Sequence, residues 1–191
     1  MAPIRVVQLV PGMIRRQNGM VLEAHSSVTL VSTPGSKMVV DTSTVENREL
    51  LVSRLEFHGL ALEDVDTVIN THLHMDHSGN NDLFSEARFL AHVDEIPPRP
   101  YEPVLENMEL VEGVELIHTP GHTRGSMTVL VQADKRYAIA GDALPTKDNY
   151  GKWVPPNLNY HPQLALRSME RIVEMADVIV PGHDEAFPVD R

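Results

Sequence analysis

The stretch TVINTHLHMDHSGN, residues 67–80, constrains the fold more than any other part of the chain. Its apolar start is typical of a buried strand, and His72, His74, Asp76 and His77 then follow within six positions. On an extended segment, side chains two residues apart point the same way, so His72 and His74 share one side and the other two can take the opposite side. This crowding indicates either a polar loop that is rich in histidine by chance or a metal centre.

Three later stretches repeat the same form, in which an apolar strand ends and a residue able to bind metal follows. LIHTPG precedes His122, AIAG precedes Asp142, and VIVPG precedes His183. Residues at strand ends are held by a rigid sheet while they face a cleft, an arrangement that favours catalytic sites. The chain has no cysteine, so thiolate ligands are excluded and His, Asp, Glu or backbone groups must hold any metal.

The order of the expected elements indicates two sheets rather than one alternating parallel sheet. Strands precede the first helix, which ends near Gly59, and later strands come in consecutive pairs before a second helix that begins at Pro162. This pattern favours two mixed sheets packed face to face with helices outside. The expected strands cover residues 4–10, 28–32, 38–41, 65–70, 88–91, 114–118, 127–132, 137–140 and 178–180.

The segments between these elements have few signals of regular structure. The prolines at 97, 98, 100 and 103 predict an irregular loop, and residues 142–161 read as a long polar loop. The sequence has no repeat and no linker-like segment. We therefore expect a single domain over residues 1–191.

Charge and hydropathy limit the partners and the location of the protein. The net charge is −11, whereas nucleic-acid binders usually carry a basic stripe, so nucleic acid is disfavoured as a partner and a small-molecule substrate is favoured. No apolar run approaches the ~20 residues that span a bilayer, and the N-terminus does not resemble a signal peptide. We expect no membrane association and a cytoplasmic location. A homo-oligomer remains open, because a second copy could cover exposed loops beside the site.

The motifs THLHMDHSGN, TPGHTRGS, AGDAL and VPGHD, in this order, resemble the metallo-β-lactamase-fold hydrolase superfamily. The resemblance runs from about Asp41 to His183. GHTRGS, ADVIVPGH and Asn80 after Ser78-Gly79 are most similar to the group of metallo-β-lactamase-domain-containing protein 1. The resemblance implies an α/β fold, a four-layer α/β/β/α sandwich of two mixed β-sheets flanked by helices, with a dinuclear metal site at one edge of both sheets.

The resemblance also implies a role for each of these residues. Two divalent ions are expected, with Zn²⁺ as the first choice and Fe or Mn as alternatives. Asp76 is expected to position a metal-bridging hydroxide. Asp41 matches the acid that supports the metal ligands without binding the metal itself. The expected ligands are His72, His74 and His122 for one ion, Asp76, His77 and His183 for the other, and Asp142 as the bridge.

These residues predict a dinuclear-metal-dependent hydrolase whose bridging hydroxide attacks the carbonyl of an ester, thioester, lactone or amide. The alternative is a metal-dependent phosphodiesterase or nuclease, because two metals also suit phosphoryl displacement. A metal-binding scaffold without turnover is a third possibility, and the intact ligand set argues against it. His74 stands where the flavodiiron branch carries Glu, which argues against oxygen reduction. The end of the chain at Arg191 weakens an interpretation as glyoxalase II, whose relatives carry a further helical region.

The loop after Asp142 holds most of the remaining candidate residues. Tyr150, Trp153 and Tyr160 either anchor this loop on the core or form a lid over the site, where they would contact substrate. His161 precedes Pro162 at a helix start, which favours capping, with substrate contact as the alternative. Four further histidines have no partners in sequence and are expected to be structural or exposed: His25, His58, His92 and His118.

Overall fold

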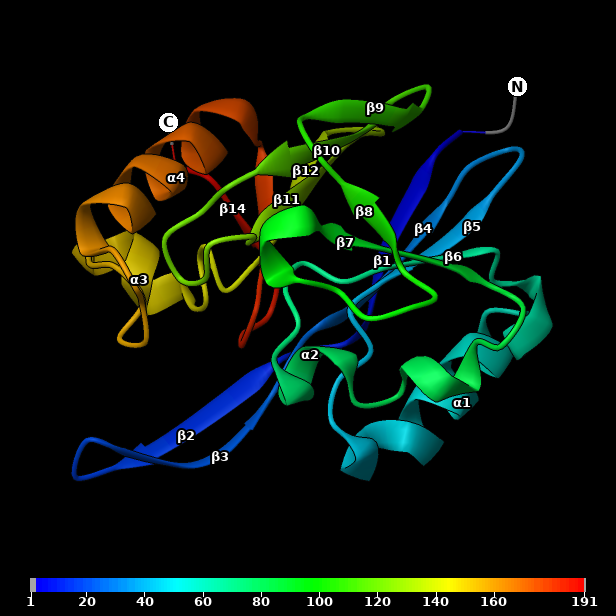
Figure 1. Ribbon diagram of the computed structural model, residues 1–191, viewed down its shortest axis with the longest axis horizontal. Coiled ribbons are helices and arrows are strands. Elements are labelled where there is room, and N and C mark those ends of the chain that lie inside the picture. Colours follow the sequence, from blue (N-terminus) through cyan, green and yellow to red (C-terminus); the bar gives the residue numbers. More distant parts are fainter. Residues whose placement is uncertain (1–2, 191) are drawn as a thin grey trace.

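All the strands expected from the sequence are present in the computed structural model, which describes residues 3–190 (Figure 1). Two six-stranded sheets have the orders β1-β4-β5-β6-β7-β8 and β14-β13-β12-β11-β10-β9. The first sheet consists of β1 (Arg5–Val10), β4 (Val28–Ser32), β5 (Lys37–Val40), β6 (Thr67–Ile69), β7 (Arg88–His92) and β8 (Glu102–Val104). The second consists of β9 (Met108–Val111), β10 (Val114–His118), β11 (Met127–Gln132), β12 (Arg136–Gly141), β13 (Val178–Pro181) and β14 (Phe187–Pro188).

Both sheets are mixed. Strands β5 to β8 run parallel in the first sheet, and β12 and β13 run parallel in the second, while the other neighbours are antiparallel. Parallel neighbours need a crossover, and the two main helices lie in crossovers of this kind. Helix α1 (Arg48–Phe57) lies between β5 and β6 in the chain, and α4 (Pro162–Met175) lies between β12 and β13.

Three apolar clusters define the four layers of the molecule. The central cluster joins Met38 and Ile69 of the first sheet to Leu116 and Val129 of the second. The strands are apolar on both faces because successive residues point to opposite sides and both sides are buried. The outer face of the first sheet packs against Leu51 and Leu55 of α1, and the outer face of the second packs against Met169 and Ile172 of α4. The predicted α/β/β/α sandwich is confirmed.

The remaining helices are short. They are α2 (Met75–Ser78), α3 (Lys147–Lys152) and the 3-10 turns η1 (Val45–Asn47), η2 (Leu62–Asp64), η3 (Asn81–Leu83) and η4 (Val93–Glu95). Within residues 3–190, no helix combines the length and the apolar character that crossing a bilayer requires.

Several elements differ from the expectation, and two of them are the short strands β9 and β14, which lie where the sequence predicts no strand. The proline-rich loop contains β8, and Pro103 is tolerated there because β8 is the edge strand of its sheet. The loop after Asp142 contains α3, which Thr146 caps by accepting a hydrogen bond from the Asn149 amide. A separate hairpin, β2 (Met13–Gln17) and β3 (Met20–His25), extends away from the sandwich (Figure 1). We refer to it as the β2–β3 hairpin.

Gly121 is a position where the fold requires glycine. Its φ is 140°, and a Cβ there would lie 2.3–2.6 Å from atoms of Ala165 in α4. Its carbonyl also accepts hydrogen bonds from the Tyr160 and His161 amides, so this close approach fixes the loop before His122 against α4.

We predict that Gly121→Ala lowers the free energy of unfolding by about 2–4 kcal/mol, because the backbone strain and the clash with α4 act together. Chemical denaturation would measure the change. Gly35→Ala is the matched control, because a Cβ at Gly35 meets nothing within 4 Å, and its cost should stay within about 0.5 kcal/mol. Equal stability of the two variants would contradict the close approach.

Candidate metal centre

The ends of four strands deliver the predicted ligands to one edge of the sandwich. After β6 the chain passes through residues 70–74 into α2, and this segment carries His72, His74, Asp76 and His77. His122 lies in the loop after β10, Asp142 directly follows β12, and His183 follows β13. Predicted ligands from both sheets therefore meet at a single place.

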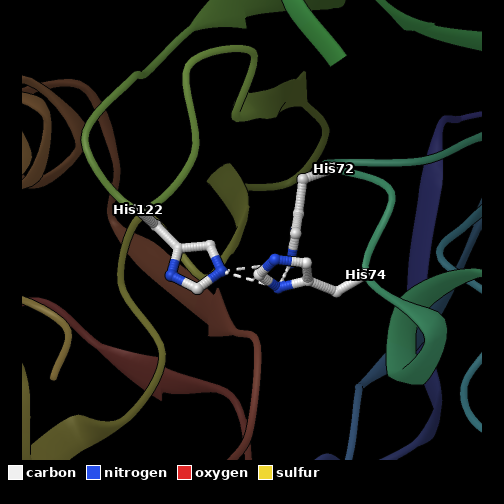
Figure 2. A group of neighbouring side chains, drawn as sticks. All are labelled: His72, His74 and His122. Carbon is white, nitrogen blue, oxygen red and sulfur yellow. Dashed lines mark hydrogen bonds between the residues drawn. The ribbon is translucent and has the colours of Figure 1, made fainter. Parts of the chain in front are cut away.

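The first ligand group consists of His72, His74 and His122, whose ring nitrogens converge (Figure 2). The Nε2 atom of His72 lies 3.1 Å from His74 Nδ1 and 3.2 Å from His122 Nε2, and the latter two atoms are 3.1 Å apart. Three nitrogens at this spacing can each lie about 2.0–2.1 Å from one ion, the usual Zn–N distance. The geometry suits a three-histidine metal site.

The second ligand group consists of Asp76, His77 and His183. The Nε2 atom of His183 lies 3.5 Å from Asp76 Oδ2. Asp142 lies between the two groups: its Oδ2 is 3.5 Å from His122 Nε2, while its Oδ1 is 3.2 Å from His183 Nε2 and 3.4 Å from His77 Nε2. The two oxygens of one carboxylate thus face different groups.

Two of these facing atoms are buried without a hydrogen-bond partner. They are Nε2 of His77 and Oδ1 of Asp142, and both belong to fully or nearly fully buried side chains. Buried polar atoms in a folded protein are almost always satisfied, and an unsatisfied nitrogen and oxygen aimed at a common space fit a cation there. The residues present therefore fit a metal at this position.

Backbone carbonyls orient two of the histidine rings. Nδ1 of His122 donates to the Leu158 carbonyl at 2.6 Å, and Nδ1 of His183 donates to the His25 carbonyl at 2.9 Å. A carbonyl oxygen can only accept, so the proton of each neutral ring is on Nδ1 and the lone pair is on Nε2. In both rings this lone pair faces the other ligands, which is how metal-binding histidines are usually held.

Asp41 orients two more rings from one position. Its Oδ2 accepts hydrogen bonds from His77 Nδ1 at 2.8 Å and from Thr71 Oγ1 at 2.7 Å, and its Oδ1 accepts one from the Thr71 amide at 2.8 Å. Because the Thr71 hydroxyl uses its hydrogen on Asp41, it can only accept from Nδ1 of His72, 3.2 Å away. In the neutral form of each ring, the lone pair of His72 and of His77 is then on Nε2. Asp41 itself has a φ of 56°, in the left-handed region.

Burial and nearby charge shift the pKa values of the histidines in opposite directions in the two ligand groups. Burial lowers the pKa of His72 well below its usual value and also lowers the pKa of His122, so both rings stay neutral. Burial acts in the same direction on His77, but the Asp41 and Asp142 carboxylates outweigh it and raise the pKa of His77 well above its usual value. The pKa of His183 is raised in the same way by Asp142.

The same contacts act on the Asp142 carboxylate in the opposite sense. Burial opposes its ionisation, but His183 and His77 hold the pKa of Asp142 well below its usual range. The carboxylate is therefore charged at neutral pH, as an anionic metal ligand must be.

The four candidate residues of the loop after Asp142 have different surroundings. Tyr150 packs on Phe187, and its hydroxyl accepts a hydrogen bond from the Asp190 amide. His161 caps α4, because its side chain accepts a hydrogen bond from the Leu164 amide, which confirms the favoured interpretation of this residue. Trp153 and Tyr160 are about half exposed. A lid made by these aromatic side chains stays a prediction.

A pocket of about 570 Å³ adjoins the second ligand group. Its wall is formed by the β2–β3 hairpin on one side and by α3 and the chain after it on the other. The pocket is lined by His183, by Met13, Ile14 and Arg16 of β2, and by Asn149 and Lys152 of α3. A ligand in this pocket would lie beside His183.

The root of the β2–β3 hairpin contacts the second ligand group through its backbone, which the sequence did not reveal. Besides the His25 carbonyl, the Ser26 amide donates to the Asp76 carbonyl at 3.0 Å and the Ser27 amide donates to the Gly182 carbonyl at 2.7 Å. Gly12 at the other root approaches so closely that a Cβ would lie 2.7 Å from Cα of His183. Backbone contacts of this kind leave no signature in the residue types.

A further set of potential ligands, His92, Asp94 and His118, lies outside the two groups. The two imidazole rings stack at 3.9 Å with an angle of 8° between their planes. Ring lone pairs lie in the ring plane, so in stacked rings they run side by side and do not converge on one ion. These two histidines are structural, as the sequence led us to expect.

Several known proteins are similar to this chain in sequence, in fold or in both. The family model described as the metallo-beta-lactamase superfamily matches residues 22–95 and 92–183. A protein of Methanocaldococcus jannaschii named "probable metallo-hydrolase" is 37% identical over 95% of this chain and 87% of its own length. Metallo-beta-lactamase domain-containing protein 1 of Xenopus laevis is 34% identical over 98% of this chain and 83% of its own.

Two further similarities concern a lactonase and a solved structure. An N-acyl homoserine lactonase of a Bacillus species is 32% identical over 76% of this chain and 66% of its own length. The crystal structure of a metallo-beta-lactamase-like protein of Thermotoga maritima superposes with a TM-score of 0.82, at 21% identity, over 98% of this chain and all of that one.

We predict that Asp41→Asn lowers the pKa of His77 in chelator-treated protein, because it removes a negative charge that favours the imidazolium. The stability lost, about 1–3 kcal/mol, should be largest at pH values below the ordinary pKa of histidine and should shrink as the pH rises through the raised pKa of His77. NMR titration of the ring and denaturation at several pH values would measure both. Asp134→Asn, at an exposed acid bonded to Tyr137, is the control. An unchanged His77 pKa would contradict this role of Asp41.

Proposed function

The chain belongs to the metallo-beta-lactamase superfamily and is a metal-dependent hydrolase, and on this basis we propose that it uses a dinuclear site to hydrolyse a small carbonyl substrate. The substrate class is an ester, thioester, lactone or amide, with a lactone as the first choice. The ligands in this proposal are the two groups described above, with Asp142 shared between them.

The position of Asp142 carries the dinuclear part of the proposal. Its Oδ2 faces His122 of the first group, and its Oδ1 faces His77 and His183 of the second. One carboxylate that serves two ions spans such a pair of sites, and the unpaired Oδ1 and His77 Nε2 supply the lone pairs on the second side. Five imidazoles and two carboxylates suit Zn²⁺, with Fe or Mn as alternatives.

Bound divalent ions supply two effects in such a site: they polarise the substrate carbonyl and lower the pKa of a bound water. The side chains of this chain supply the rest. Asp41 and the His25 and Leu158 carbonyls hold the rings in the tautomer that leaves each Nε2 free. Asp76, whose side chain is partly exposed, is the carboxylate we assign to orienting the attacking water.

The carbonyl substrate class rests on two observations. The pocket beside His183 gives a small molecule room next to the second ligand group. One relative is named as a lactonase, which acts on a cyclic ester. The hydrolysis of a lactone needs a polarised carbonyl and an activated water, and the proposed site offers both.

The expected cytoplasmic location, the homo-oligomer and the single-domain organisation stay predictions.

We predict that purified wild-type protein, reconstituted with Zn²⁺, holds close to two ions per chain, and that Asp142→Ala holds close to one. The first group keeps its three histidines. The second group loses the carboxylate oxygen that faces both His77 and His183 and keeps the partly exposed Asp76 as its one anionic ligand. Metal analysis after gel filtration would measure the ratio. Asp148→Ala, an exposed acid paired with Lys152, is the control for a lost carboxylate. Two ions in the Asp142→Ala protein would contradict the bridge.

We predict that the metal-loaded protein hydrolyses a lactone at least about tenfold faster than a phosphodiester of similar size, because its site is proposed to act on carbonyls. A panel of a lactone, a thioester, a β-lactam and a phosphodiester would test this, with His74→Ala as the control for adventitious hydrolysis. Phosphodiester cleavage as the main activity would overturn the carbonyl class. The absence of any turnover in fully loaded protein would overturn hydrolysis of these classes altogether.

A further inference from the structure

Glu95, the last residue of η4, places its carboxylate between the two loops that carry the first ligand group. Its Oε2 accepts a hydrogen bond from the Leu73 amide at 3.0 Å, and its Oε1 accepts one from the Gly125 amide at 3.0 Å. Leu73 lies between His72 and His74, and Gly125 lies three residues after His122. One partly buried side chain thus connects both loops.

The two loops come from different sheets, so their separation is not set by either sheet alone. The loop with His72 and His74 continues β6 of the first sheet, and the loop with His122 joins β10 to β11 of the second. A backbone hydrogen bond from the Met127 amide to the Thr71 carbonyl, 2.8 Å long, ties the loops together at their bases. Glu95 adds a connection beside the ligands themselves.

The local backbone is shaped around this contact. A Cβ on Gly125 would lie 2.7 Å from the Glu95 amide nitrogen and 2.8–2.9 Å from its Cγ and Oε1. Gly125 has no left-handed φ, so the close approach of Glu95 is what requires a glycine there. Ile96, the next residue after Glu95, has a φ of 52°, which is strained for a β-branched side chain. Strain of this kind persists where the surroundings hold the backbone in place.

We propose that Glu95 is a positioning residue whose carboxylate clamps the loop of His72 and His74 to the loop of His122 and thereby sets the affinity of the first ligand group for its metal. This inference rests on the proposed function, because it takes these three histidines as ligands. A carboxylate is suited to the task, since it offers acceptor oxygens on both sides and no donor that would repel an amide N–H.

The main test compares Glu95→Gln with wild type. The glutamine side chain is nearly the same size, but its NH₂ group would face one of the two backbone N–H groups, so one of the two hydrogen bonds is lost. We expect Zn²⁺ binding at the first group to weaken about 10–100-fold, as for other groups that orient metal ligands. Competition with a chelator would measure the affinity, and His74→Ala would identify which binding step belongs to the first group.

A second readout needs no metal. Amide hydrogen exchange of Leu73 and Gly125 should accelerate in the Glu95→Gln protein, while the Met127 amide at the base of the loops should keep its protection. The matched control is Asp94→Asn, which removes one negative charge from the adjacent residue, whose carboxylate is half exposed and 3.8 Å from His92. That variant should leave both the affinity and the exchange of these amides unchanged.

A double-mutant cycle tests the contact itself. Gly125→Ala should weaken metal binding in the wild-type background, because its Cβ meets Glu95. In a Glu95→Ala background the side-chain part of this clash is absent, so the same substitution should cost less. Additive effects would overturn the direct contact.

The outcomes separate this inference from the proposed function. Wild-type protein that binds no metal would overturn the proposed function and, with it, the effect of Glu95 on affinity. Wild-type protein that binds two ions, with a Glu95→Gln variant that binds them equally tightly, would overturn the positioning role alone. Weakening of both binding steps to the same degree would show a general structural role and would also overturn it.

Discussion

The apolar contact between the inner faces of the two sheets sets the distances in the rest of the structure. Met38 and Ile69 on one side and Leu116 and Val129 on the other keep the sheets at a fixed separation, which is about 10 Å in sandwiches of this kind. Each ligand group combines residues that follow strands of different sheets. Their spacing therefore depends on a packing interaction that lies away from the ligands and contains no polar group.

Around the two ligand groups, backbone carbonyls and a carboxylate orient the imidazole rings, which apolar packing does not do. Packing brings the loops together to within a few ångströms, but it does not choose the tautomer of an imidazole or the direction of its lone pair. Asp41 and the carbonyls of His25 and Leu158 make that choice for three rings. The apolar core thus sets the positions of the loops, and hydrogen bonds set the orientation and tautomer of the rings.

The sequence predicts the family, the layers and the place of the ligand loops, because these depend on patterns within short segments. It does not predict contacts made by main-chain atoms, since every residue has a carbonyl: nothing distinguishes His25 or Leu158 in this respect. Glu95 is equally hidden, because its two partners are amides at Leu73 and Gly125. The β2–β3 hairpin could have been found, since Asn18 and Gly19 form the dipeptide typical of a two-residue turn and both have positive φ.

The root of the β2–β3 hairpin is packed against the candidate metal centre, whereas its tip is exposed. Its root, at Gly12 and residues 25–27, is fixed by close packing and backbone hydrogen bonds to the segments of Asp76 and His183. A Cβ added at Gly19, at its tip, would meet nothing within 4 Å, and Met20 and Val21 beside it are mostly exposed. Chain length and side chains near the tip can therefore change without altering the contacts that hold the segments of Asp76 and His183, while Arg16, which pairs with Val21 near the tip, lines the pocket. A hairpin held in this way can vary at its tip, beside the pocket, while its root keeps the same contacts with the candidate metal centre.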